Sequence, residues 1–119
     1  MCIRDRTRAI GEHLAAGPDR VRARLAALGR ATRERLDGRG GWRVVEPLDE
    51  PTALTTLTAP DGVDVREVSA RLRTEHGVLT TAPGRERAPG ELAGPVLRVS
   101  PHLDATLGGL DALATALAP

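Results

Sequence analysis

Lysine, phenylalanine and tyrosine are absent from this 119-residue sequence, and Trp42 is its only aromatic residue. Because no lysine is present, no side chain of the chain can form a Schiff base, which excludes lysine-dependent covalent catalysis within it. The core has to be built from Leu, Val and Ala, without the large contribution that buried aromatic rings make. We therefore expect marginal stability if the domain stands alone.

Cysteine and histidine are scarce as well. Cys2 is the single cysteine, which excludes a disulfide framework and a cysteine-based metal site. His13, His76 and His102 are widely separated and do not have the spacing of metal ligands. The sequence also lacks an apolar run long enough to span a bilayer and a secretory signal. We therefore predict a cytoplasmic protein with no metal and no membrane partner.

What the sequence does have is arginine. All 17 basic residues are arginines, the net charge is +1, and the length suits one small soluble domain. Residues 1–43 hold 11 arginines against 5 acids, whereas residues 44–119 hold 6 against 11. An arginine-rich helix can bind nucleic acid, but no nucleic-acid motif or aromatic stacking platform accompanies it. A solvated face with local acidic partners explains the pattern better, and we predict no nucleic-acid partner.

The first six residues, Met-Cys-Ile-Arg-Asp-Arg, resemble a translated sequencing-adapter remnant. We therefore exclude residues 1–6 from the expected fold as a non-native leader, which would make this chain the C-terminal piece of a longer protein. The alternative is a native, frayed N-terminus.

Residues 7–38 predict connecting helices. Thr7 to Ala16 reads as the end of one helix, and Gly17-Pro18 breaks it and starts another. One face of the second helix is marked by residues at helical spacing: Val21, Leu25, Leu28, Thr32 and Leu36. Gly38 is a natural left-handed stop. In an isolated domain we expect an exposed apolar patch, either along Val21, Leu25 and Leu28 or on one face of the sheet.

Residues 39–119 predict a small domain of strands and helices. Runs rich in β-branched residues predict four short strands: Trp42–Val45, Thr52–Thr58, Val78–Thr81 and Val96–Ser100. Asp64 and Gly77 are expected to bound a helix between the second and third strands. A final helix is expected to follow Thr106, with Leu107, Leu110, Leu113 and Leu117 on one face. The predicted fold is α+β, a three- to four-stranded sheet covered by helices, with a long N-terminal connecting helix.

Arg98 stands out as an arginine in an otherwise apolar strand. We expect its guanidinium to be at least half-buried, so it needs an acceptor, and its planar fork suits a carboxylate. A structural partner among Glu91, Asp104 and Asp111 is one possibility. A ligand carboxylate is the other. The residues alone leave both open.

The segment that follows carries a family resemblance. The pattern Arg98-x-Ser100-x-His102, with Thr106 beyond it, resembles the C-terminal signature of class V pyridoxal-phosphate enzymes. Asp104 and Ala105 depart from the Tyr and Asn that are usual in this family. Four segments are more similar to one branch, the C–S lyases of actinobacterial ergothioneine biosynthesis: residues 41–47, 50–52, 86–89 and 96–102.

The resemblance implies the C-terminal small domain of a fold type I enzyme, whose missing large domain holds pyridoxal phosphate. It implies a homodimer and a small amino-acid substrate, hercynylcysteine sulfoxide, cleaved by β-elimination. It assigns the substrate carboxylate to Arg98. Arg87, in a loop that could border the substrate entrance, and His102 are further substrate-binding candidates. The alternatives are a solvated loop charge for Arg87 and a surface-turn histidine for His102. It implies no catalytic or cofactor-binding residue here, so this chain alone should be inactive.

Two alternatives remain from the sequence. One is another class V enzyme, a cysteine desulfurase or an aminotransferase. The other is a stand-alone arginine-rich binding module that shares the pattern.

Overall fold

The computed structural model describes residues 3–117. Its α-helices are α1 (Ile3–Ala16), α2 (Pro18–Leu36), α3 (Val65–His76) and α4 (Leu107–Leu117). Its strands are β1 (Arg43–Val44), β2 (Thr55–Thr58) and β3 (Leu97–Val99), joined as one antiparallel sheet in the order β1-β2-β3. Two short 3-10 helices, η1 (Arg39–Gly41) and η2 (Arg85–Arg87), lie in the connections. This arrangement confirms the predicted α+β fold.

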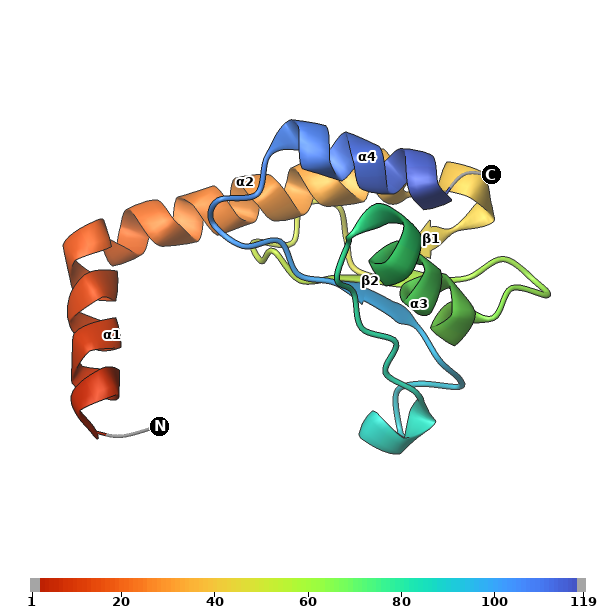
Figure 1. Ribbon diagram of the computed structural model, residues 1–119, viewed down its shortest axis with the longest axis horizontal. Coiled ribbons are helices and arrows are strands. Elements are labelled where there is room, and N and C mark those ends of the chain that lie inside the picture. The colour runs from red at the N-terminus through yellow and green to blue at the C-terminus, as the bar shows by residue number, and fades with distance from the viewer. Residues whose placement is uncertain (1–2, 118–119) are drawn as a thin grey trace.

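An elbow at Gly17 separates α1 from α2. Gly17 has a positive φ of 87°, which glycine adopts at little cost, and Pro18 begins α2. Figure 1 shows α2 lying along the body of the molecule while α1 turns away from it. Helix α1 contains no buried residue, and its Ile10 and Leu14 side chains are 60% and 62% exposed.

The expected apolar patch on α2 is partly wrong. Leu28 is 1% exposed, because the body of the molecule covers α2 from this point onward, and Val21 and Leu25 are half-buried. The exposed apolar side chains lie instead on α1. They share a helical spacing of seven and four residues: Ile3, Ile10 and Leu14.

The expected leader overlaps α1. Met1 and Cys2 lie outside the described residues, whereas residues 3–6 form the first turn of α1. The hydroxyl of Thr7 donates a 3.0 Å hydrogen bond to the carbonyl of Ile3. The helix therefore runs through the boundary between residues 6 and 7 without a break, and the foreign origin of the first six residues stays a prediction.

The ends of α3 and the start of α4 lie at the capping residues that the sequence predicts. The Asp64 carboxylate accepts hydrogen bonds from the backbone N–H groups of Arg66 and Glu67 and so caps α3. Gly77 ends α3 in the left-handed conformation with a φ of 66°. The Thr106 hydroxyl accepts a 3.0 Å hydrogen bond from the N–H of Gly109 at the start of α4.

The predicted strand Val78–Thr81 is wrong. The N–H of Val78 donates to the carbonyl of Leu72 and closes the end of α3, so the chain leaves the helix in a turn. Leu79 is 75% exposed. Only Thr81 reaches the sheet, where it forms an isolated bridge to Arg98.

One face of the sheet carries the core. Its buried residues come from β2, β3, all three helices of the body and the segment after α2: Leu36, Trp42, Leu57, Val65, Leu72, Leu97, Val99, Leu113, Ala114 and Leu117. Leu107 is 52% exposed, so the apolar face of α4 begins only at Leu110. The opposite face of the sheet presents Thr56 and Arg98, which are paired neighbours on β2 and β3.

Arginines tie α2 to the C-terminal part of the chain. Arg24 donates to the carbonyls of Leu103 and Ala105, at 3.4 and 2.9 Å. Arg35 pairs with Asp111 of α4 at 2.8 Å. These bonds hold the turn before α4, which carries His102, against α2.

Arg33 is fully buried and organises the connection between β1 and β2. Its guanidinium donates to the carbonyls of Leu48, Glu50, Thr52 and Leu54. One turn earlier on the same side of α2, Gly29 lets the same connection approach closely. A Cβ at Gly29 would lie 1.9 Å from the carbonyl oxygen of Thr52. The expectation that the arginines of this helix form a solvated face is therefore wrong for Arg33.

Candidate functional site

Arg98 lies at the centre of β3 and points to the open face of the sheet. Its neighbours Leu97 and Val99 are buried, whereas the Arg98 side chain is exposed. The alternation of side chains along a strand explains this pattern, since two inward residues force the one between them outward. The expected burial of Arg98 is therefore wrong. Its backbone is nevertheless fixed on both sides, by Thr56 in β2 and by reciprocal hydrogen bonds to Thr81.

No acid of the chain supplies the expected structural partner within residues 3–117. Asp111 pairs with Arg35 at 2.8 Å, and Asp104 accepts from His102 at 3.2 Å. Within the described part of the chain, no carboxylate, Glu91 included, forms an ion pair with Arg98. The backbone of Arg98 is thus fixed by the sheet, and its guanidinium is open to an external anion.

A pocket of about 490 Å³ brings Arg98 and Arg87 together. Its lining residues come from β3 and from the segment that leads into the long loop: Thr81, Ala82, Pro83, Glu86, Arg87 and Arg98. The loop returns along itself, because the N–H of Val96 donates to the carbonyl of Pro83. Two of the three predicted substrate-binding residues therefore line the same pocket, although they are separated by eleven positions in the sequence.

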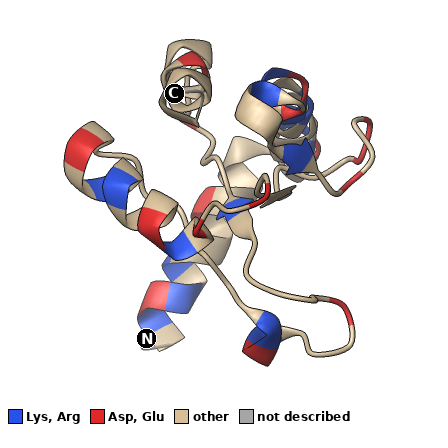
Figure 2. Ribbon diagram, turned by 90° about the vertical axis from the view of Figure 1, so that its right-hand side faces the viewer, with Lys and Arg blue, Asp and Glu red and all other residues tan. Residues whose placement is uncertain are grey.

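The loop adds one acid to the pocket. Glu86 lies in η2 between Arg85 and Arg87, where Figure 2 shows positive and negative residues following one another. Hydrogen bonds from its own backbone N–H and from Gly84 lower the pKa of the Glu86 carboxyl, and the nearby charges of Arg66 and Arg87 act in the same direction. Arg66 lies 3.5 Å from this carboxylate. The pocket thus offers two guanidinium groups and one ionised carboxylate.

His102 does not join this pocket. It lies on the exposed turn after β3, and its Nδ1 is 3.2 Å from the Asp104 carboxylate. The pocket's lining does not include it. Its assignment to the substrate stays a prediction that this geometry does not support.

Sequence reasoning missed two charged residues near Arg98. Glu86 entered only as part of the segment 86–89 that carries the family resemblance, and Arg73 of α3 was not considered, yet Arg73 lines a second pocket with Arg98. A local signal for Arg73 exists. Residues three and four positions away on its helix are Ser69, Ala70, His76 and Gly77, so no acid is placed to neutralise it.

Other kinds of site find less support in the described residues. No group of three or more potential metal ligands occurs among them. Within residues 3–117, no helix has the length and apolar character needed to cross a membrane.

Comparison with known proteins gives one informative relative. No protein-family model matches the chain. A curated protein of Mycobacterium tuberculosis (strain CDC 1551 / Oshkosh), named probable hercynylcysteine sulfoxide lyase, is 55% identical to it over 109 residues. The match covers 92% of this chain but 28% of the relative, so the chain spans little more than a quarter of that protein's length. The identity confirms the resemblance inferred from the sequence.

Proposed function

We propose that this chain, similar over nearly its whole length to part of a hercynylcysteine sulfoxide lyase, is the C-terminal domain of a longer C–S lyase. The 55% identity supports the lyase, and the 28% coverage of the relative supports a larger parent protein. The proposed reaction is β-elimination of hercynylcysteine sulfoxide, which releases the sulfur product with pyruvate and ammonia. The cytoplasmic location and the homodimer stay predictions.

The proposed cofactor of the parent enzyme is pyridoxal phosphate, and this chain does not hold it. Its sequence contains no lysine, so it cannot supply the Schiff base that anchors this cofactor. The anchor therefore belongs to the rest of the parent protein. By itself the chain should be inactive.

The role proposed for this chain is to hold the substrate's α-carboxylate with Arg98. The observation that carries it is an exposed guanidinium on a fixed strand, facing a pocket and without an acid partner in residues 3–117. A planar guanidinium grips a carboxylate with two parallel hydrogen bonds, which fixes its orientation as well as its position. We place Arg87 at the rim of the same pocket as a second cation for the substrate.

The test is Arg98→Lys in the full-length enzyme. Lysine keeps the charge but loses the two-pronged grip, so kcat/KM should fall about a hundredfold, or roughly 3 kcal/mol of transition-state stabilisation. Pyruvate release, coupled to lactate dehydrogenase, measures the turnover. Arg43→Lys is the matched control and should behave as wild type, because Arg43 is an exposed arginine on β1, which β2 separates from β3.

Two further readouts make this test specific. Thermal stability and cofactor absorbance should stay unchanged in Arg98→Lys, because the side chain contacts no core partner. Normal turnover by the Arg98→Lys enzyme would remove the basis of the proposal. A desulfurase or an aminotransferase would share the carboxylate-binding arginine but would not release pyruvate, so the product distinguishes these alternatives from the lyase.

A further inference from the structure

A second pocket, of about 340 Å³, adjoins the first across Arg98. Six residues from α3, the segment after it and the end of β3 line this pocket: Arg73, Leu79, Thr80, Thr81, Arg98 and Ser100. Thr81 and Arg98 belong to both pockets. A ligand gripped by Arg98 can therefore extend from the first pocket into the second.

Arg73 is held over this second pocket by its own helix. One turn before it, the Ser69 hydroxyl lies 3.0 Å from the Thr80 hydroxyl and 3.2 Å from the Thr80 carbonyl. Ser69 and Arg73 are four residues apart and so lie on the same face of α3. The Ser69–Thr80 contacts thus orient this face of the helix, and with it Arg73, toward the segment that lines the pocket.

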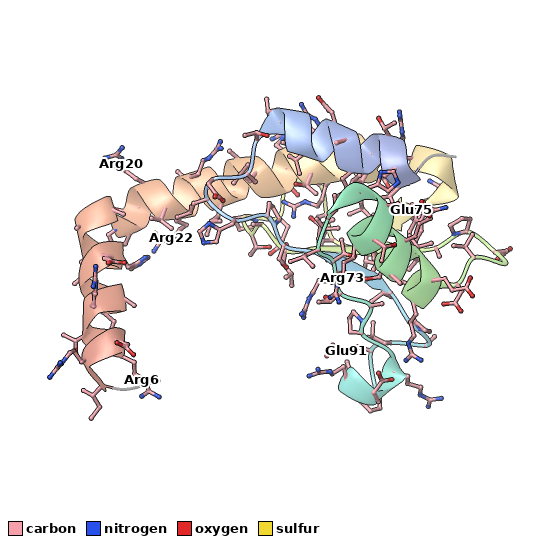
Figure 3. The ribbon with its side chains drawn as sticks, viewed as in Figure 1. Arg6, Arg20, Arg22, Arg73, Glu75 and Glu91 are labelled. Atoms are coloured by element: carbon pink, nitrogen blue, oxygen red, sulfur yellow. The ribbon has the colours of Figure 1, made fainter. Side chains whose placement is uncertain are left out.

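The second pocket has positive charge that no acid offsets within residues 3–117. None of its lining residues is acidic, and Arg73 takes part in no ion pair of the described chain. The nearest acid along the helix, Glu75, is two positions away, and Figure 3 shows the two side chains on different sides of α3. Two guanidinium groups without a counter-ion on one pocket favour an anionic ligand group.

The pocket also has an apolar wall. Leu79 is 75% exposed beside the two arginines, in the short turn that replaces the predicted strand. An exposed leucine next to paired cations suits a ligand that combines an anion with a ring or a short carbon chain. A free inorganic anion would make no use of it.

We propose that Arg73 determines specificity by binding a second carboxylate, carried by the substituent on the substrate's sulfur. This inference rests on the proposed function, in which Arg98 grips the amino-acid end. The substrate class is then the cysteine sulfoxides whose sulfur substituent is itself an amino-acid derivative. Hercynylcysteine sulfoxide belongs to this class, because its hercynyl group bears an imidazole ring and a carboxylate. The ring would lie against Leu79, and the carboxylate would meet Arg73.

The experiment compares two substrates of the full-length enzyme. Hercynylcysteine sulfoxide carries the second carboxylate, whereas S-methylcysteine sulfoxide has the same amino-acid end without it. For Arg73→Gln we expect kcat/KM on hercynylcysteine sulfoxide to fall about tenfold or more, mainly through KM, because a charged hydrogen bond to the bound substrate is lost. Turnover of S-methylcysteine sulfoxide should be unchanged.

Two variants control for structural effects. Arg73→Lys keeps the charge and should recover part of the lost affinity, while Arg20→Gln, an exposed arginine on α2, should match wild type with both substrates. The thermal midpoint of Arg73→Gln should equal that of wild type. Equal losses on both substrates, or no loss on either, would overturn the role of Arg73.

The two proposals fail in different ways. If Arg98→Lys impairs both substrates but Arg73→Gln impairs neither, only the second carboxylate site is refuted. If Arg98→Lys turns over both substrates normally, the proposed role of Arg98 is refuted, and the inference about Arg73 loses its basis.

Discussion

Replacing the buried Arg33 with methionine tests how the connection between β1 and β2 is held. Methionine keeps an unbranched side chain, shorter than that of arginine, and removes every donor. Four carbonyl groups of residues 48–54 then lose the guanidinium that now binds them. The connection between β1 and β2 also lies directly against Gly29 of α2. It therefore cannot fill the space left by the guanidinium without disturbing its contact with Gly29.

The expected cost is large for one substitution. A hydrogen bond from a charged donor contributes about 1.5–3 kcal/mol, and a buried acceptor left unsatisfied costs about 1–3 kcal/mol. Some of the four carbonyls will reach water once the connection loosens, so the costs do not simply add. We expect a loss of about 3–5 kcal/mol, a large share of the roughly 5–15 kcal/mol that stabilises a typical domain.

Urea unfolding measures this loss directly. Trp42 is the only tryptophan and is 2% exposed, so its fluorescence reports the core. With a slope of about 1–3 kcal/mol per molar urea, the midpoint should fall by about 1 M or more. Arg30→Met is the matched control, because Arg30 lies one turn away on α2, where it pairs with Glu34 in an exposed position. Equal midpoints for Arg33→Met and Arg30→Met would refute the reasoning.

The pKa of Glu86 and the exposed face of α1 give two further predictions. Backbone N–H groups and nearby arginines lower the pKa of Glu86 in the folded chain, so the ionised carboxylate stabilises η2. This stabilisation is fully present above the carboxyl's ordinary pKa. It is lost as the pH falls through the lowered pKa of the folded chain. NMR titration should give a pKa below the ordinary glutamate value, and a value at or above it would contradict the geometry. We expect the isolated chain to associate in a concentration-dependent way through α1, because the Ile10 and Leu14 side chains are more than half exposed, and replacing both with serine should weaken this association. Sedimentation velocity would show this, with Leu107→Ser as the control, and unchanged association of the double variant would exclude α1 as the contact.

The helix boundaries were predictable because single residues specify them. Gly17-Pro18, Asp64 and Gly77 act through their own backbone preferences or side-chain acceptors, which a sequence displays directly. The strand predicted at Val78–Thr81 failed for the opposite reason. Its β-branched composition was right for a strand, but the hydrogen bond from Val78 to Leu72 commits the chain to a turn, and only the folded structure reveals that competition.

The candidate site was predictable only in part. Arg98 was first singled out as an arginine in an apolar strand, and the family resemblance then assigned it a ligand. The structure places Arg98 and Arg87 on one pocket. Arg33 and Arg73 were missed because a helix rich in arginine does not show locally which guanidinium is buried and which faces a ligand. That choice depends on what packs against the helix, and the partners of Arg33 lie 15 to 21 residues farther along the chain.

The elbow at Gly17 has a mechanical consequence for the position of Arg98. Helix α1 has 14 residues and is therefore about 21 Å long. A rotation of about 10° at its base moves its tip by about 4 Å, more than the length of a hydrogen bond. If α1 is fixed to the rest of the parent enzyme, the same rotation at Gly17 instead moves α2 and the sheet, and Arg98 moves with them.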